Sequence, residues 1–151
     1  MRNGIDGDAF VAPTFGQRLG GRVLDSLFLA PVFAVLALVA HGATFWIVGS
    51  ALIACYEIAG EVISGQTLGK RIVGTRVVSI SSGSLRKWQA VTRALCYWAP
   101  TLFFLAIGLQ LPTDAWTAIV ILPILRPPLH RGLHDFAART IVTSTRVAAV
   151  R

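Results

Sequence analysis

The apolar positions of this chain fall into four long runs, and the segments between them hold most of the charged residues. The runs predict helices at about residues 22–40, 43–63, 94–111 and 115–128. A hydrocarbon core of about 30 Å needs about 20 helical residues, so runs of this length match membrane crossings. The pattern predicts an all-α integral membrane protein with four transmembrane helices, formed by one domain over residues 1–151.

The fourth run is short for a crossing, because its uncharged core covers only residues 116–125. We nevertheless expect it to cross, since otherwise the basic residues that follow would lie on the opposite side from all the others. Arg126 would then extend its side chain toward the headgroups, and Pro127 and Pro128 would end the helix. A re-entrant fourth segment is the alternative interpretation.

The basic residues indicate the orientation. All 14 Lys and Arg residues lie in three blocks, and none lies between Arg22 and Lys70 or between Arg93 and Arg126. They are Arg2, Arg18, Arg22, Lys70, Arg71, Arg76, Arg86, Lys87, Arg93, Arg126, Arg131, Arg139, Arg146 and Arg151. Short loops rich in Lys and Arg stay on the cytoplasmic side, so we expect both termini and the central loop, residues 64–93, in the cytoplasm.

The central loop carries a strand signal. Residues 72–80 are rich in Val and Ile, and the turn-forming residues 81–84 follow directly. This pattern predicts a small cytoplasmic β-hairpin between the second and third transmembrane helices.

Composition supports a membrane protein and narrows the expected partners. Hydrophobic residues make up 54% of the chain and charged residues 14%, against about 25% charged in soluble domains. The net charge of +7 would also suit a nucleic-acid partner, but no nucleic-acid-binding motif accompanies it. We expect instead that the basic face attracts anionic lipid headgroups, at about 1 kcal/mol for each residue near the surface.

Two patterns suggest a phosphate-binding loop and a histidine metal site, but neither meets the requirements of such a site. The segment Gly65 to Arg71 resembles a phosphate loop, but it has one residue too few between its glycines and Arg in place of the hydroxyl residue. His41 belongs outside while His130 and His134 belong inside, so the three histidines cannot form one metal site. No nucleophile with a matching base is evident. We therefore predict no enzyme, no cofactor and no metal.

Three carboxyl groups fall within the inner ends of the first two helices: Asp25, Glu57 and Glu61. A charge at membrane depth costs about 2.5–3.5 kcal/mol at the bilayer centre, so each group requires a partner or a proton. Arg18 and Arg22 share a helical face with Asp25. Glu57 and Glu61 have four candidate partners: Arg18, Arg22, Lys70 and Arg93.

Two interpretations of these carboxyl groups remain open. In the first, they pair with cations and fasten the helix ends together. In the second, Asp25, Glu57 and Glu61 form a proton or cation site, as ionisable residues in membranes often do. The outer halves of the predicted helices offer no further ionisable groups, which argues against a complete path within one chain.

Three ordered motifs resemble those of the RDD family of membrane proteins. The segment from Arg18 to Asp25 is similar to the family's R-x-x-A-x-x-I-D opening, and the segment from Arg131 to Asp135 to its closing R-x-x-H-D. The central segment resembles the family's G-Q-T-P-G-K-R stretch, through Gly65, Gln66, Thr67, Gly69, Lys70 and Arg71. Gly21, Arg22 and Leu68 depart from the family pattern.

The resemblance implies a prokaryotic protein of the plasma membrane and identifies Arg18, Asp25 and Asp135 as the residues that name the family. We expect these three to form a charge cluster between the first helix and the C-terminal segment. For function, we expect a structural or accessory component, in a homo-oligomer or a larger membrane complex. The alternative is a transporter that exchanges sodium and protons or exports an unidentified ligand, as the resemblance also implies.

Overall fold

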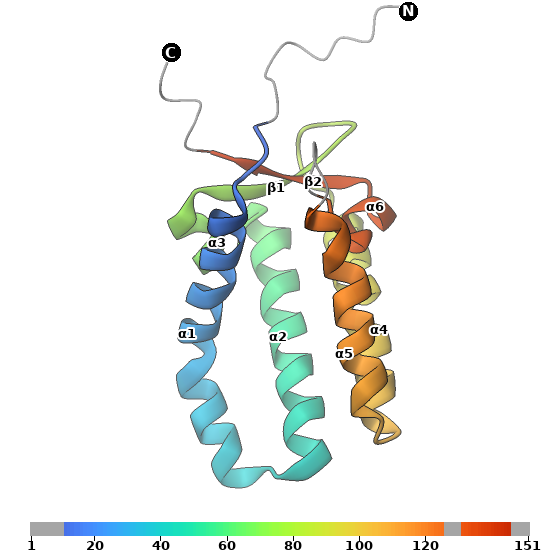
Figure 1. Cartoon of the computed structure of the whole chain (residues 1–151). Helices are drawn as coiled ribbons and strands as arrows, with labels where there is room; N and C mark the ends of the chain where they lie inside the picture. The colour runs from blue at the N-terminus through green and yellow to red at the C-terminus, as the bar shows by residue number, and fades with distance from the viewer. Residues whose placement is uncertain (1–10, 126–130, 146–151) are drawn as a thin grey trace, which may run out of the picture.

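The computed structural model describes residues 11–125 and 131–145, and four long helices make up most of it. These are α1 (Phe15–Val39), α2 (Gly42–Ser64), α4 (Lys87–Ala106) and α5 (Gln110–Ile121), which run side by side in Figure 1. The short elements lie together at one end of the bundle. They are α3 (Leu68–Val73), β1 (Thr75–Ser79), the 3₁₀ turn η1 (Leu122–Leu125), α6 (Leu133–Ala137) and β2 (Thr140–Ser144).

The helices occupy the predicted apolar runs, but three of them have bounds that differ from the prediction. The first helix begins at Phe15 rather than near residue 22, because Thr14 caps it: the Thr14 hydroxyl accepts from the Gln17 amide at 3.2 Å. The third long helix spans Lys87–Ala106 rather than 94–111, and the fourth begins at Gln110 rather than near residue 115. Gly108, with φ of 76°, follows its end in a left-handed conformation. Residues 126–128 of the fourth predicted helix lie outside the described residues.

The predicted hairpin is also wrong, although its strand exists. β1 pairs in antiparallel register with β2, from near the end of the described chain, with Val77 opposite Val142 and Ser79 opposite Thr140. Residues 81–84 lead on toward α4 instead of returning along the strand. A run of Val and Ile indicates a strand but does not identify the strand with which it pairs. Here most residues of β1 and β2, which are far apart in the sequence, are buried.

Apolar burial is concentrated at the sheet end of the molecule. Val77, Val78, Ala138, Ile141 and Val142 are buried there. By contrast, only 6% of the most apolar window of α1 and 22% of that of α2 is buried. Exposed apolar surface of this extent is expected where a helix faces lipid rather than water.

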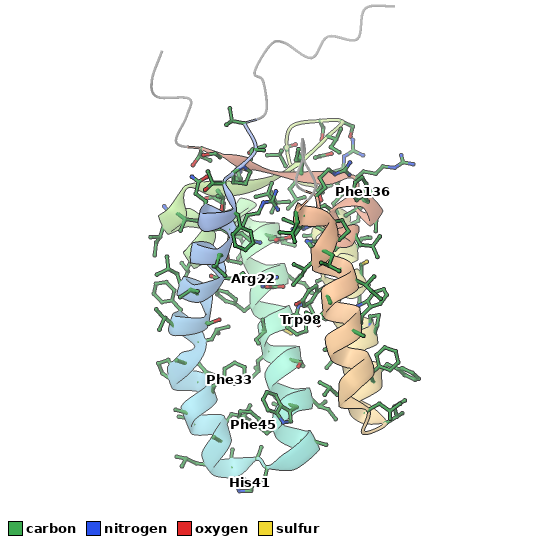
Figure 2. All side chains as sticks on the ribbon, viewed as in Figure 1. Arg22, Phe33, His41, Phe45, Trp98 and Phe136 are labelled. Carbon is green, nitrogen blue, oxygen red and sulfur yellow. The ribbon has the colours of Figure 1, made fainter. Side chains whose placement is uncertain are left out.

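By length and hydropathy, α1 and α2 each qualify as membrane-spanning helices, while residues Ala115–Leu125 form a shorter apolar helix. Every Lys and Arg that the structure describes lies in the first eight residues of α1, at or near the start of α4, in α3, or in and around the sheet. The opposite end of the α1 and α2 pair is the turn that carries His41 (Figure 2). Charge and apolar surface are therefore separated along the bundle.

Candidate functional site: a buried polar network at the sheet end

Asp25 is held by three hydrogen bonds from two other elements. Its carboxylate accepts from the Tyr56 hydroxyl at 2.6 Å, the Thr67 hydroxyl at 2.6 Å and the Gly69 amide at 2.8 Å. The residue is only 6% exposed. Because all three donors are neutral, Asp25 joins α1 to α2 and to the start of α3 without a basic partner among the described residues.

The loop motif, residues 65–71, supplies two of these three donors through its local geometry. Gly65 ends α2 in a left-handed conformation with φ of 71°, which a glycine adopts without strain. Gln66 donates to the Thr75 carbonyl at 3.0 Å and so ties the loop to β1. Thr67 caps α3 and also donates to Asp25, while Gly69 brings its amide to the same carboxylate. The motif is therefore a connector that positions donors for Asp25.

Gly69 is required for close contact between α1 and α3. A Cβ atom at this position would collide with the Gly21 carbonyl oxygen and would lie 2.8 Å from the Asp25 amide nitrogen. Gly69→Ala should therefore lower the free energy of unfolding by about 1–3 kcal/mol, the usual cost of overpacking. Chemical unfolding in detergent micelles would measure this loss.

Gly16→Ala is the matched control, because it adds the same methyl group to α1 where the nearest atom is 3.9 Å away. It should be neutral or slightly stabilising, since Ala favours a helix over Gly. Equal losses for the two variants would contradict the close-contact role of Gly69.

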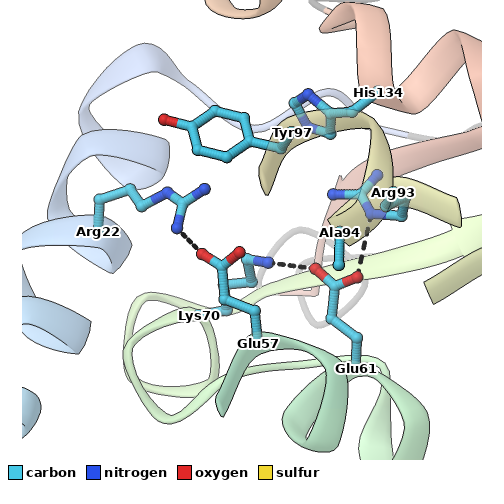
Figure 3. Close-up of a pocket in the computed structure, with 8 residues that line it drawn as sticks. All are labelled: Arg22, Glu57, Glu61, Lys70, Arg93, Ala94, Tyr97 and His134. Carbon is cyan, nitrogen blue, oxygen red and sulfur yellow. Dashed lines mark hydrogen bonds and ion pairs between the residues drawn. The ribbon is translucent and has the colours of Figure 1, made fainter. Parts of the chain in front are cut away.

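Glu57 bridges α1 and α4. It forms an ion pair with Arg22 of α1 and accepts a hydrogen bond from the Trp98 indole of α4 at 2.9 Å (Figure 3 shows the ion pair). The Arg22 guanidinium also lies 5.7 Å from the Tyr97 ring centroid, within the range of a cation–π contact.

Glu61 and Arg93 form the centre of the network. The Glu61 carboxylate accepts from Lys70 Nζ at 2.5 Å and from Arg93 Nε at 3.0 Å (Figure 3). Arg93 Nη1 also pairs with Asp135 and donates to the Thr140 hydroxyl at 2.8 Å. Through one guanidinium, α2 and α4 are joined to α6 and β2. Burial lowers the pKa of the Lys70 ammonium, and the attraction of Glu61 opposes this effect.

Asp135 is fully buried. Besides pairing with Arg93, it accepts from the Gly132 amide at 3.0 Å at the start of α6. Arg131 holds the same segment from outside, because its Nε donates to the Thr140 carbonyl at 3.0 Å and its Nη2 to the Asp135 carbonyl at 3.1 Å. The closing motif therefore fastens α6 and β2 to α4.

The expected cluster of Arg18, Asp25 and Asp135 does not form. Asp25 contacts neutral donors and Asp135 contacts Arg93, while Arg18 Nε and Nη2 are buried with no hydrogen-bond partner in the part of the chain that the structure describes. Helical spacing correctly placed Arg18 and Asp25 on one helix, but the two side chains have different surroundings and do not contact each other in any described ion pair. The three residues belong to one end of the fold without contacting one another in any described ion pair.

The predicted partners of Glu57 and Glu61 are largely confirmed: Arg22, Lys70 and Arg93 all pair with them, while Arg18 does not. Sequence analysis missed the neutral partners Tyr56, Thr67 and Trp98, and it missed Arg93 as the partner of Asp135. Arg93 offered one signal, because it is the last charge before an uncharged helical segment. Its partner on α6 could not be read from spacing.

His134 lies against this network as a buried neutral group. Burial lowers its pKa well below the usual value, and the nearby positive charges of Arg93, Arg22 and Lys70 act in the same direction. Its imidazole lies 3.7 Å from the Asp135 carboxylate and packs edge-on against Tyr97. Near neutral pH the contact with Asp135 is therefore not an ion pair.

In the unfolded chain His134 would take up a proton near pH 6.5, whereas in the folded chain its pKa is well below that value. The unfolded state then binds more protons below that pH, so stability should fall as the pH falls, by up to about 1.4 kcal/mol per pH unit from this one group. His134→Gln should flatten the dependence of the free energy of unfolding between pH 7.5 and pH 5.5 by about that slope. His41→Gln, at an exposed position, should leave it unchanged.

The network encloses a cavity of about 20 Å³, which is large enough for one water molecule. Arg22, Glu57, Glu61, Lys70, Arg93, Ala94, Tyr97 and His134 line it (Figure 3). Within the described residues, no group of three or more His, Cys, Asp or Glu side chains is arranged to hold a metal ion. The geometry is that of a polar clamp between helices.

A larger cavity of about 380 Å³ lies between α1 and α2. Asp25, Tyr56 and Glu57 are at its polar end, and Leu29 and Phe33 are among the apolar residues that line the rest. Its volume is within the range of small-molecule sites, about 300–1,000 Å³.

Comparison with known protein families yields a match. No curated protein and no solved structure was found to be similar to this chain. The sequence profile of the RDD family matches residues 12–139, which include both terminal motifs and the central loop. All three segments that bear the family resemblance contribute groups to the polar network at the sheet end, together with residues of α2 and α4. The chain therefore belongs to the RDD family, and its apolar helices are those of a membrane protein.

Proposed function

We propose that the chain crosses a bacterial plasma membrane four times and serves as a structural or accessory component of a membrane assembly. In this orientation the sheet end faces the cytoplasm. The location of the described basic residues at that end supports this, because loops rich in Lys and Arg stay inside. The described chain also begins and ends there, since the Ser144 amide donates to the Val11 carbonyl at 2.9 Å.

The observation that best supports the accessory role is that each carboxylate at the inner ends of the helices already has hydrogen-bond donors or cations of this chain as partners. Asp25 accepts three hydrogen bonds, Glu57 pairs with Arg22, Glu61 with Lys70 and Arg93, and Asp135 with Arg93. Carboxylates with such partners fasten the helices and strands to one another. They are poor ligands for a transported cation, because their oxygens are already engaged. This favours the fastening interpretation over a proton or cation site.

The outer halves of the helices add a second argument. Within the described side chains, α1 beyond Asp25, the part of α2 before Glu57 and α4 beyond Arg93 contain no Asp, Glu, Lys or Arg. A transported ion would need polar groups across the whole span, because unpaired charge in hydrocarbon is costly. An accessory role requires no such path.

Sidedness can be tested by labelling. A Cys introduced at Ser82, in a background with Cys55 and Cys96 replaced by Ala, should react with a membrane-impermeant maleimide only after cells are permeabilised. A Cys at His41 should react in intact cells, because it lies at the opposite end of the helices. Labelling of the Ser82 position in intact cells would contradict the proposed orientation.

Reconstitution separates the accessory role from transport. In proteoliposomes loaded with a pH-sensitive dye, we expect no proton movement driven by sodium or potassium gradients. Sodium-dependent flux that is lost in a folded Glu57→Gln variant would contradict the proposal and establish exchange. Purification in mild detergent should instead retain a partner, or a second copy, at a fixed ratio, as native mass spectrometry would show.

Export of a small ligand is the second candidate, and the cavity between α1 and α2 is the observation that favours it. A bulky replacement of Ala30, which lines this cavity, would fill it. Loss of a measurable substrate flux in Ala30→Trp, with the folded state retained, would support export.

A further inference from the structure

Arg18 differs from the other cations at the inner ends of the helices. Arg22, Lys70 and Arg93 each pair with a carboxylate, whereas Arg18 Nε and Nη2 are buried and have no hydrogen-bond partner in residues 11–125 and 131–145. Burying a charged group without a hydrogen-bonded partner is costly, and removing one partner of a buried pair is strongly destabilising. A guanidinium in this position therefore calls for an anion.

The surroundings of Arg18 strengthen this requirement. Arg93 acts on it electrostatically, which adds positive potential instead of neutralising it. Arg18 is also near the start of α1, a long helix with no acidic residue in its first turn. Helix N-termini carry a partial positive charge, so the two effects add.

A cavity of about 120 Å³ adjoins Arg18. Its other described lining residues are Pro13, Phe15, Ile124 and Leu125, none of which can neutralise a cation. Phe15 is 61% exposed and Leu125 57% exposed, so the apolar walls open to the surroundings of the bundle. The site combines a buried donor pair with an apolar, open rim.

We propose that this cavity binds the phosphate group of an anionic phospholipid, such as phosphatidylglycerol, from the leaflet at the sheet end. The inference rests on the proposed membrane topology, which places the start of α1 at headgroup depth. A guanidinium binds a phosphodiester through two parallel hydrogen bonds, and the exposed Phe15 and Leu125 side chains would contact the glycerol and upper acyl carbons. The apolar rim favours a lipid over free phosphate as the source.

Lipid titration of the purified chain tests this site. After delipidation in detergent, phosphatidylglycerol, diacylglycerol and inorganic phosphate would each be added, and bound mass and thermal midpoint would be followed by native mass spectrometry and calorimetry. Phosphatidylglycerol should bind at one site and raise the midpoint. Diacylglycerol, which lacks the phosphate, and inorganic phosphate, which lacks the apolar part, should do neither at the same concentration.

Two variants locate the site. Arg18→Gln should weaken binding of phosphatidylglycerol by roughly tenfold to a hundredfold, the effect expected for losing a charge-assisted contact. Arg18→Lys keeps the charge but not the paired geometry, so it should bind with intermediate affinity. Arg71→Gln removes one exposed cation from the same end of the molecule and should bind as the parent does.

Equal weakening in Arg71→Gln and Arg18→Gln would overturn the proposal, because it would mean general attraction to a basic surface. Stabilisation by inorganic phosphate that matches the lipid would also overturn it. If Arg18→Gln does not fold, the comparison of phosphatidylglycerol with diacylglycerol on the parent chain and on Arg18→Lys decides the matter. The lipid-binding results do not depend on which side of the membrane the sheet end faces. Failure of the lipid site can therefore be distinguished from failure of the proposed orientation, which the labelling experiment tests.

Discussion

Replacing Arg93 with Leu should lower the free energy of unfolding by about 3–5 kcal/mol, because breaking a buried ion pair leaves an uncompensated charge. Glu61 would keep Lys70, but Asp135 would lose its cation while fully buried. The loss would separate α6 and β2 from α4, so the C-terminal strand should also lose amide protection. Chemical unfolding in mixed micelles and hydrogen exchange at β2 measure the two effects.

Lys87→Leu is the matched control, since it removes a cation from the exposed first turn of the same helix. It should change the free energy of unfolding by no more than about 0.5 kcal/mol. A double-mutant cycle adds a second check: Arg93 and Asp135 should be coupled, while Arg18 and Asp135 should be additive. Coupling in the second cycle but not in the first would restore the cluster expected from sequence and contradict the network described above.

Replacing Asp25 with Asn should cost about 2–4 kcal/mol, because hydrogen bonds to a charged acceptor are strong and an amide nitrogen cannot accept them. The Tyr56 and Thr67 hydroxyls and the Gly69 amide all donate to the carboxylate. The Asn side chain offers one acceptor oxygen and turns an amide toward another donor. We expect the start of α3 to separate from α1, measured as a lower thermal midpoint in detergent.

Ser26→Ala provides the control, because Ser26 is the exposed neighbour of Asp25 on the same helix. Its effect should be small. Combining Asp25→Asn with Tyr56→Phe should cost less than the sum of the single losses, since the second change removes one unsatisfied donor. An Asp25→Asn variant as stable as the parent would contradict the role of this carboxylate in joining α1 to α3.

The layout of the chain relative to a membrane follows from local patterns. Apolar runs located the long helices because spanning segments must be uniformly apolar and of a fixed length. The blocks of Lys and Arg predicted that charge would gather at one end, and the described residues confirm this gathering. The helix start at Phe15 was missed because capping by Thr14 extends the helix into polar sequence.

Contacts between distant segments were predicted less well. The strand propensity of residues 72–80 was recognised, but pairing of β1 with β2 depends on where the C-terminal segment packs. Likewise, helical spacing favoured Arg18 as a partner of Asp25, whereas the loop between α2 and β1 folds back and supplies Thr67 and Gly69. Spacing along one helix identifies possible partners on that helix, but it does not show which groups from other segments will pair with the residue instead.

The sequence by itself therefore determined which segments are apolar, which end carries the charge, and which ionisable groups need partners, because these depend on residue type and short-range periodicity. Tertiary structure alone decided that Asp25 is satisfied by neutral donors, that Arg93 joins Glu61 to Asp135, and that Arg18 has no carboxylate partner among the described residues. Each of these outcomes depends on which segments, far apart in the chain, approach within hydrogen-bond distance, and the cost of burying a charge selects among them.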